Sequence, residues 1–367
     1  MASGLAGRWL RLNGPARIGG VDLARGLAVI GMFAAHLLVT ADHWEWSDPS
    51  TWLFIVDGRS SILFATLAGV SVGLVTGGAV PLTGDRMRTA RGRLAVRAGM
   101  LWLIGILLIL TGVPVYVILP AYALLFLLVL PFTALTASAV LWAAAGIGAV
   151  MAFVQPLLNE LPLWHGPFGE EISAALGWNY PFPVWIAFVL AGLGIARADV
   201  RRLRTQLWML GAGSALAVVG YSMSTAPPES LYLQSVLTAE PHSSGLFEVF
   251  GTGGFAIAVI GVCLLLCRAD AIRMLVLPLR AVGAMPLTAY TAQLLIWAAV
   301  ALATIGDTED LLAFRALEPF WPLTIGTVIG CTAWALLIGR GPLEWLLDRT
   351  AKIVVPARPR MVDRLNP

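Results

Sequence analysis

The stretch VDLARGLAVIGMFAAHLLVT, residues 21–40, indicates the fold class of the whole chain. It is a nearly continuous run of apolar side chains, and about 20 such residues are what an α-helix needs to cross a bilayer. Similar runs recur along the 367 residues, of which 58% are hydrophobic and only 12% charged. Soluble domains carry about 25% charged residues, so this composition predicts a membrane protein whose apolar side chains face lipid.

We therefore predict an all-α polytopic membrane protein with about ten transmembrane helices and with both termini in the cytoplasm. Residue usage rich in Ala, Gly and Arg but poor in Lys is typical of a high-GC bacterium, so we expect it in the plasma (inner) membrane. The predicted spans are 24–42, 52–77, 94–113, 115–136, 138–156, 182–197, 205–224, 246–267, 283–304 and 320–339.

The distribution of basic residues sets the predicted orientation, because cytoplasmic loops carry an excess of Lys and Arg. The connections that we place inside contain Arg8, Arg11, Arg17, Arg86, Arg88, Arg91, Arg93, Arg201, Arg202, Arg204, Arg268, Arg273, Arg280, Arg349, Lys352, Arg358, Arg360 and Arg364. The outer connections contain the acids Asp42, Glu45, Asp48, Glu160, Glu170, Glu171, Glu229, Glu240, Asp307, Glu309 and Asp310. Only Arg315 lies in a predicted outer loop. This alternation requires an even number of spans.

Around the predicted transmembrane domain, 21–340, we expect two cytoplasmic pieces. These are an N-terminal segment, 1–20, and an amphipathic helix followed by a basic tail, 341–367. The first long apolar run is the first span itself, so we expect no cleaved signal peptide. The longest outer connection, 157–181, has room for a short amphipathic helix.

Several features exclude other classes of protein or indicate only packing. The arginines lie between apolar runs and form no basic patch, so a net charge of +3 gives no reason to expect nucleic acid as a partner. The three cysteines lie inside apolar runs, where a buried, inert thiol is the default, and we expect no metal site. In the second span the small residues Ser61, Ala65, Gly69 and Gly73 recur every four positions, which favours close approach of a neighbouring helix.

Ionisable residues inside a span are costly, so each is a functional hypothesis. In the first span Asp22, Arg25 and His36 lie on one helical stripe, and His43 continues that stripe if the helix runs on. The structural alternatives are an ion pair that anchors the helix start and a histidine hydrogen-bonded to a neighbouring helix.

The second span holds an acid and a guanidinium, Asp57 and Arg59, below the outer surface. They pair with each other and a neighbour, or they line a hydrated pocket, and His36 lies at a similar depth on the preceding helix. For His165 and His242, in outer loops, we predict a plain surface role.

Five blocks of sequence, taken together in their order and spacing, resemble the bacterial relatives of heparan-α-glucosaminide N-acetyltransferase. These relatives lie in the transmembrane acyltransferase superfamily, near the families DUF418 and DUF1624, and the resemblance covers about 20–340. The blocks are VDLARGLAVIGMFAAH (21–36), DGRSSILFATLAGVSVGL (57–74), RLAVRAGMLWLIGILL (93–108), ILPAYALLFLLVLP (118–131) and LRAVGAMPLTAYTAQLLI (279–296).

The resemblance implies transfer of an acyl group, typically acetyl, from cytoplasmic acyl-CoA to a sugar or glycolipid acceptor at the outer face. The family's catalytic histidine lies in or near the first outer loop, a place held here by His43. His36 stands where the lysosomal relative carries a polar asparagine. The sequence departs from that relative in the length of this loop and in the segment DGRSS, which leaves the choice between His36 and His43 open.

Within this interpretation a neutral histidine acts as a general base, or becomes acetylated and passes the group on. Arg59 either stabilises a developing oxyanion or forms a structural pair with Asp57. The residues expected to contact acyl-CoA are Arg25, Arg93 and Arg97, near inner ends of spans, and Tyr290 and Gln293, on one face of the ninth span.

The main alternative function is a proton-coupled transporter or lipid flippase, which would also use buried charges. The absence of a visible inverted repeat argues against it, and a non-catalytic scaffold gives no account of the polar groups in the first two spans. The sequence leaves the acceptor, the acyl chain length and the oligomeric state open, and a homo-oligomer is compatible with it.

Overall fold

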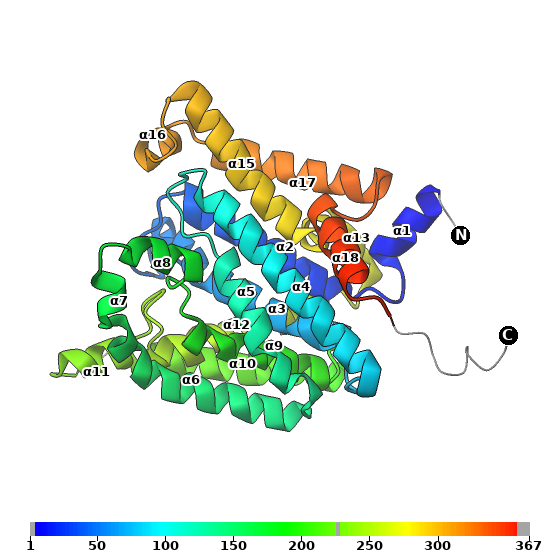
Figure 1. Cartoon of the computed structure of the whole chain (residues 1–367), viewed down its shortest axis with the longest axis horizontal. Coiled ribbons are helices and arrows are strands. Elements are labelled where there is room, and N and C mark those ends of the chain that lie inside the picture. The colour runs from blue at the N-terminus through cyan, green and yellow to red at the C-terminus, as the bar shows by residue number, and fades with distance from the viewer. Residues whose placement is uncertain (1–3, 225–227, 358–367) are drawn as a thin grey trace.

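The described residues, 4–224 and 228–357, form only helices and connecting turns in a computed structural model (Figure 1). All ten predicted spans fall on helices. These helices are α2 (Gly19–Leu37), α3 (Arg59–Val75), α4 (Gly84–Ile109), α5 (Leu119–Leu128), α6 (Ala137–Asn159), α9 (Phe182–Arg197), α10 (Leu203–Met223), α12 (Leu246–Leu266), α15 (Pro286–Thr304) and α17 (Phe320–Leu337). Shorter elements connect them: α1 (Leu5–Asn13), η1 (Pro49–Val56), η2 (Leu130–Ala134), α7 (Pro162–His165), α8 (Gly169–Leu176), α11 (Leu231–Val236), α13 (Asp270–Leu275), α14 (Leu277–Ala284), α16 (Leu311–Ala316) and α18 (Pro342–Val354).

The all-α membrane fold is confirmed, whereas the number of spans is established only in part. By length and apolar composition, seven helical segments of the described chain can cross a bilayer, with η1 and α3 counted as one. Two further predicted spans, α5 and α9, are apolar but have only 10 and 16 residues. The last, α10, has 21 residues and is not among the seven. Ten spans therefore stay a prediction.

The short helices gather at two opposite ends of the bundle, as Figure 1 shows. The helices α7, α8, α11 and α16 lie at the left, and α1, α13 and α18 lie at the right. The first end carries the predicted outer loops, so we call it the arginine-poor end. The second carries the predicted cytoplasmic connections, and we call it the arginine-rich end. This separation agrees with the predicted orientation.

Glycines at helix crossings bring the bundle together. A methyl group at Gly69 of α3 would collide with the carbonyl oxygen of Val189 in α9, and one at Gly192 of α9 would collide with that of Thr66. Gly73 packs in the same way against Ala196. The close approach predicted from the small-residue stripe of the second span is confirmed, and α9 is the partner.

Two of the differences between predicted spans and observed helices move candidate site residues. The first begins and ends earlier than 24–42, so α2 stops at Leu37 and His43 lies beyond it in an exposed loop. The second is not one helix over 52–77, because Gly58 adopts a φ of 63° and separates the 3-10 turn η1 from α3. Glycine reaches this conformation without steric cost. Asp57 consequently lies at a break in the helix.

The predicted helices outside the spans are present. The connection 157–181 contains α7 and α8, and the segment after the last span forms α18. The end of the predicted basic tail, 358–367, lies outside the described residues.

Candidate active site

Two cavities lie one behind the other within the bundle and share lining residues. The cavity nearer the arginine-poor end has a volume of about 190 Å³, and we call it the histidine cavity; its polar lining includes His36, Asp57, Tyr180, His242 and Arg315. The cavity nearer the arginine-rich end has a volume of about 230 Å³, and we call it the arginine cavity; its polar lining includes Arg25, Ser71, Arg97, Arg340 and Glu344. Ile118 and Tyr290 line both, so they form the boundary.

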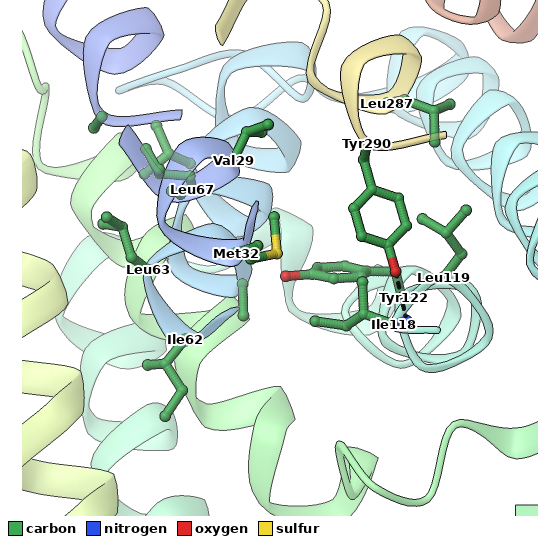
Figure 2. Packing of buried hydrophobic residues seen from close by; sticks show 14 of the residues in the cluster. Val29, Met32, Ile62, Leu63, Leu67, Ile118, Leu119, Tyr122, Leu287 and Tyr290 are labelled. Carbon is green, nitrogen blue, oxygen red and sulfur yellow. Dashed lines mark hydrogen bonds between the residues drawn. The ribbon is translucent and has the colours of Figure 1, made fainter. Parts of the chain in front are cut away.

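The boundary between the cavities is built from the start of α5 and the face of α15. Figure 2 shows Tyr290 reaching from α15 toward the backbone at Ile118, whose N–H donates to the Tyr290 hydroxyl at 3.5 Å. Tyr122, which also lines the arginine cavity, donates its hydroxyl to the Ser61 carbonyl at 3.4 Å. Each of these tyrosines is 2% exposed, so the boundary is a buried layer with few hydrogen bonds.

An acid and a histidine meet at the edge of the histidine cavity. His242 Nε2 lies 3.6 Å from Asp57 Oδ1, and the side chains are 41% and 35% exposed. Glu248, at the start of α12, fixes the backbone around His242. Its carboxylate accepts hydrogen bonds from the backbone N–H groups of His242 at 2.7 Å and Ser244 at 2.6 Å. His242 has a φ of 63°, a conformation uncommon outside glycine, and these bonds offset part of its cost.

The charge around His242 favours its protonated form. Burial by itself would lower the pKa of His242, but the contact with Asp57 and the negative charges of Glu248 and Asp57 outweigh it and raise that pKa above its usual value. A carboxylate in this position holds the histidine ring in one orientation, as it does for the catalytic base of many enzymes.

His36 lines the same cavity and has one ring nitrogen without a hydrogen-bond partner among the described residues. It lies in the last turn of α2, and its Nδ1 is buried without a hydrogen-bond partner in the described structure. Arg315 of α16 donates Nη2 to the His36 carbonyl at 3.0 Å, so a cation covers the carboxyl end of α2. An imidazole nitrogen that is not hydrogen-bonded can act as a base or a nucleophile.

Four residues, His36, His43, Asp57 and Arg59, were predicted to be catalytic, and the side chains of His43 and Arg59 lie away from the histidine cavity. His43 is exposed in its loop and lines neither cavity. The Arg59 guanidinium donates to the Tyr221 hydroxyl and the Phe54 carbonyl, each at 2.9 Å, and lies 4.7 Å from the Phe54 ring centre. It reaches only the backbone carbonyl of Asp57, at 3.4 Å. The structure therefore places His36 and Asp57 in the same cavity. Arg59 instead makes structural contacts that join the start of α3 to η1 and α10.

The arginine cavity contains three guanidinium groups. Arg25 donates to Ser71 Oγ at 2.6 Å and lies 3.3 Å from Asp22, which also binds Arg17 at 2.7 Å. This bears out the proposed ion pair at the start of the first span. Arg97 contacts Asp348 of α18 at 2.8 Å, and Arg340 contacts the same carboxylate at 2.7 Å. Guanidinium groups so placed can bind phosphate oxygens.

The other three residues predicted to contact acyl-CoA lie in different places. Tyr290 lines both cavities. Arg93 donates to the Val355 carbonyl at 2.9 Å and lines a separate cavity of about 450 Å³, which Arg97 also borders. Gln293 is completely buried, neither atom of its amide has a partner among the described residues, and it lines neither central cavity.

Among the charged and ionisable residues of the histidine cavity, His242 and Arg315 had no predicted functional role. His242 was predicted to have a plain surface role; its side chain is 41% exposed, and its ring also lines the cavity beside Asp57. No local pattern marks it, because its partner comes from a distant segment. Arg315 carried a signal, since it is the exception among outer loops that otherwise lack basic residues.

Comparison with protein families assigns both halves of the chain. The family model for the catalytic region of heparan-alpha-glucosaminide N-acetyltransferase matches residues 17–225, more than half of the chain. A model described as a protein of unknown function (DUF418) matches residues 193–353. No curated protein matches the chain. The first region contains His36 and Asp57, and the second contains His242 and Tyr290, so the two matched regions meet in the histidine cavity.

Proposed function

This chain belongs to the heparan-alpha-glucosaminide N-acetyltransferase catalytic family, and from that premise we propose that it moves an acyl group, in the first instance acetyl, from cytoplasmic acyl-CoA to a sugar or glycolipid at the outer face. Membership of the family indicates a membrane-bound acetyltransferase. One observation carries the finer proposal: a cavity lined by arginines and a cavity lined by histidines share Ile118 and Tyr290.

The donor enters from the arginine-rich end. The phosphates of CoA bind Arg25, Arg97 and Arg340, because guanidinium groups pair with phosphate oxygens through charge-assisted hydrogen bonds. The pantetheine arm then follows the apolar part of the arginine cavity, past Tyr122, so that the thioester reaches Tyr290. This arrangement places the acyl group beside the histidine cavity while the nucleotide stays at the other end.

The reaction takes place at His242 and Asp57. Since Asp57 faces Nε2, Nδ1 of His242 is the nitrogen left to accept the proton of the acceptor's hydroxyl or amine. The acceptor atom attacks the thioester carbonyl carbon, a tetrahedral intermediate forms, and the carbon–sulfur bond breaks. The leaving CoA thiolate takes the proton from His242, so protons and charges balance.

A covalent route is the second candidate, and the unpartnered Nδ1 of His36 favours it. In that route His36 attacks the thioester, CoA leaves as the thiol, and the acceptor removes the acetyl group from the imidazole. The two routes differ in one measurement. With acetyl-CoA alone, the covalent route releases about one equivalent of CoA per protein in a burst, and direct transfer releases none.

Proteoliposomes test the proposal. Protein is reconstituted with acetyl-CoA on one side of the membrane and amino or neutral sugars on the other, and acetylated sugar is measured by mass spectrometry. Transfer is expected only when acetyl-CoA faces the arginine-rich end. The proposal fails if acetyl-CoA neither stabilises the purified protein nor is consumed, and proton-linked uptake in the same vesicles would favour the transporter alternative.

A further inference from the structure

The cavity that Arg93 lines lies at the arginine-rich end, where α18 runs beside α4 (Figure 1). Its volume of about 450 Å³ is within the range of about 300–1,000 Å³ usual for small-molecule sites. We call it the side cavity. Arg97 lines both this cavity and the arginine cavity, so the two are adjacent. The charged residues that line the side cavity are Arg86, Arg93, Arg97, Asp85 and Asp348.

Three guanidinium groups lie along one face of α4 and line the side cavity. Arg86, Arg93 and Arg97 are seven and four residues apart, the spacing of side chains on one helical face. Contacts with the segment of α18 hold two of them, since Arg93 Nε donates to the Val355 carbonyl at 2.9 Å and Arg97 contacts Asp348 at 2.8 Å. A fixed row of positive charge therefore forms one wall of the cavity.

Positive charge exceeds negative charge in the side cavity. Asp85 is paired with Arg88 at 3.2 Å, and Asp348 is shared by three basic side chains at 2.6–2.8 Å. In the part of the chain that the structure describes, neither Arg86 nor Arg93 forms an ion pair with a carboxylate. Guanidinium groups bind phosphate oxygens through charge-assisted hydrogen bonds, so a phosphate is the anion that this wall fits.

The rest of the lining favours a phospholipid as the source of that phosphate. Leu82 and Leu94 line the cavity together with Val75, which ends α3 and is 46% exposed. An apolar edge at the end of a span lies where lipid tails meet the headgroups. None of the described lining residues is aromatic, so the base of a nucleotide would have no ring on which to stack. Basic pockets between transmembrane helices bind anionic headgroups in the same way.

We infer that the side cavity binds the headgroup of an anionic phospholipid from the leaflet at the arginine-rich end. The phosphate oxygens accept hydrogen bonds from Arg86 and Arg93, and the acyl chains leave the cavity over Val75. The inference goes beyond the proposed function and does not depend on it, because the phosphates of CoA are assigned to the arginine cavity. It also gives a role to Arg93, which lies outside that cavity.

Direct lipid binding tests the inference on the full chain. Protein in detergent micelles is titrated with phosphatidylglycerol or phosphatidylcholine of the same acyl chains, and bound lipid is counted by native mass spectrometry. The variants are Arg86→Gln and Arg93→Gln. The matched control is Arg88→Gln, on the same helix but with a side chain 76% exposed and outside the cavity. Thermal midpoints without lipid check the folding of each protein, and Arg86 is exposed, so its substitution should leave the fold intact.

We expect the first phosphatidylglycerol to bind at least about tenfold more tightly than phosphatidylcholine, and each cavity variant to weaken that binding at least about tenfold. Arg88→Gln should bind as the parent does, and excess acetyl-CoA should leave the lipid in place. The inference is overturned if the two lipids bind equally or if the cavity variants bind phosphatidylglycerol as the parent does.

Two competitors test the source of the phosphate. If acetyl-CoA displaces phosphatidylglycerol, the side cavity belongs to the donor site and the inference fails. It also fails if glycerol 3-phosphate displaces the lipid at an equal concentration, because the site would then take a soluble phosphate. Loss of lipid binding in the cavity variants with acetyl transfer intact supports the inference and leaves the proposed function standing.

Discussion

His242 Nε2 and Asp57 Oδ1 lie 3.6 Å apart at the edge of the histidine cavity, although one follows α11 and the other ends η1. The pair joins the two regions that different family models match. His242 also lines an adjacent cavity of about 350 Å³, so it stands where that cavity meets the histidine cavity.

Replacing the histidines one at a time separates the cavity residues from the loop residues. His242→Ala should lower the transfer rate by about 10²–10⁴-fold, the usual contribution of a general acid–base group. His36→Ala should cause a loss of similar size only if the covalent route operates. His43→Ala should leave the rate unchanged, because His43 is exposed and lines neither central cavity. The rate of acetyl-sugar formation is the measurement, with His165→Ala as a second surface control. A large loss in His43→Ala alone would contradict the site.

The charge of Asp57 should set the pH dependence of transfer. His242 works as a base only when its imidazole is neutral. Because its pKa is raised, the neutral form predominates only at higher pH. Asp57→Asn removes a negative charge that raises the pKa, so the rising limb of the rate–pH profile should move to lower pH, with a lower maximum rate. Asp48→Asn, an exposed acid in the first outer loop, should leave the profile in place. A shift to higher pH would show that His242 is not the titrating base.

Changing the boundary residue Tyr290 should impair acyl transfer but not acetyl-CoA binding. Tyr290→Trp places a larger ring between the cavities, so transfer should fall at least about tenfold while acetyl-CoA still stabilises the protein. Leu302→Trp, on the same helix but 60% exposed, is the control for adding an indole. Thermal shift with acetyl-CoA and single-turnover transfer are the two measurements. Unimpaired transfer in Tyr290→Trp would mean that the acyl group takes another route.

Loss of a guanidinium from the arginine cavity should weaken binding of the acetyl-CoA donor. Arg97→Gln removes a charged contact, and hydrogen bonds to charged groups contribute about 1.5–3 kcal/mol, so the KM for acetyl-CoA should rise at least about tenfold. Its partner Asp348 keeps Arg340 and Lys352 as neighbours. Arg88→Gln, at a side chain 76% exposed, is the matched control. Equal KM values in both variants would place the CoA phosphates elsewhere.

A stability measurement tests the helix crossing that supports the site. Gly69→Ala should lower the thermal midpoint, because the added methyl collides with the Val189 carbonyl and overpacking costs about 1–3 kcal/mol. Gly99→Ala provides the contrast. Gly99 lies inside α4 with no atom within 4 Å of an added methyl, so alanine should leave the midpoint unchanged or raise it. If both variants melt at the same temperature, the crossing of α3 and α9 is looser than described.

Local patterns were enough for the membrane fold and for part of the site. Spans can be recognised from continuous apolar runs, because the bilayer requires about 20 such residues regardless of what packs around them. His36, Asp57, Arg25, Arg97 and Tyr290 could be selected because polar groups are costly in a span. All five line one of the two central cavities.

Other positions depended on backbone geometry that no periodic pattern encodes. The break at Gly58 turns Asp57 toward His242 and Arg59 toward Tyr221, whereas a continuous helix had been expected. The end of α2 at Leu37 similarly places His43 outside the cavity. Helix ends are set by a few dihedral angles, and an apolar run tolerates a shift of several residues.

The sequence alone determined that this protein is a helical membrane protein with basic and acidic ends, because hydropathy and charge are properties of each segment by itself. Only the tertiary structure decided that His242 faces Asp57 and that Tyr290 reaches Ile118 at the boundary of the two central cavities. Those contacts join segments far apart in the chain, and their distances follow from how closely helices such as α3 and α9 pack at their glycines.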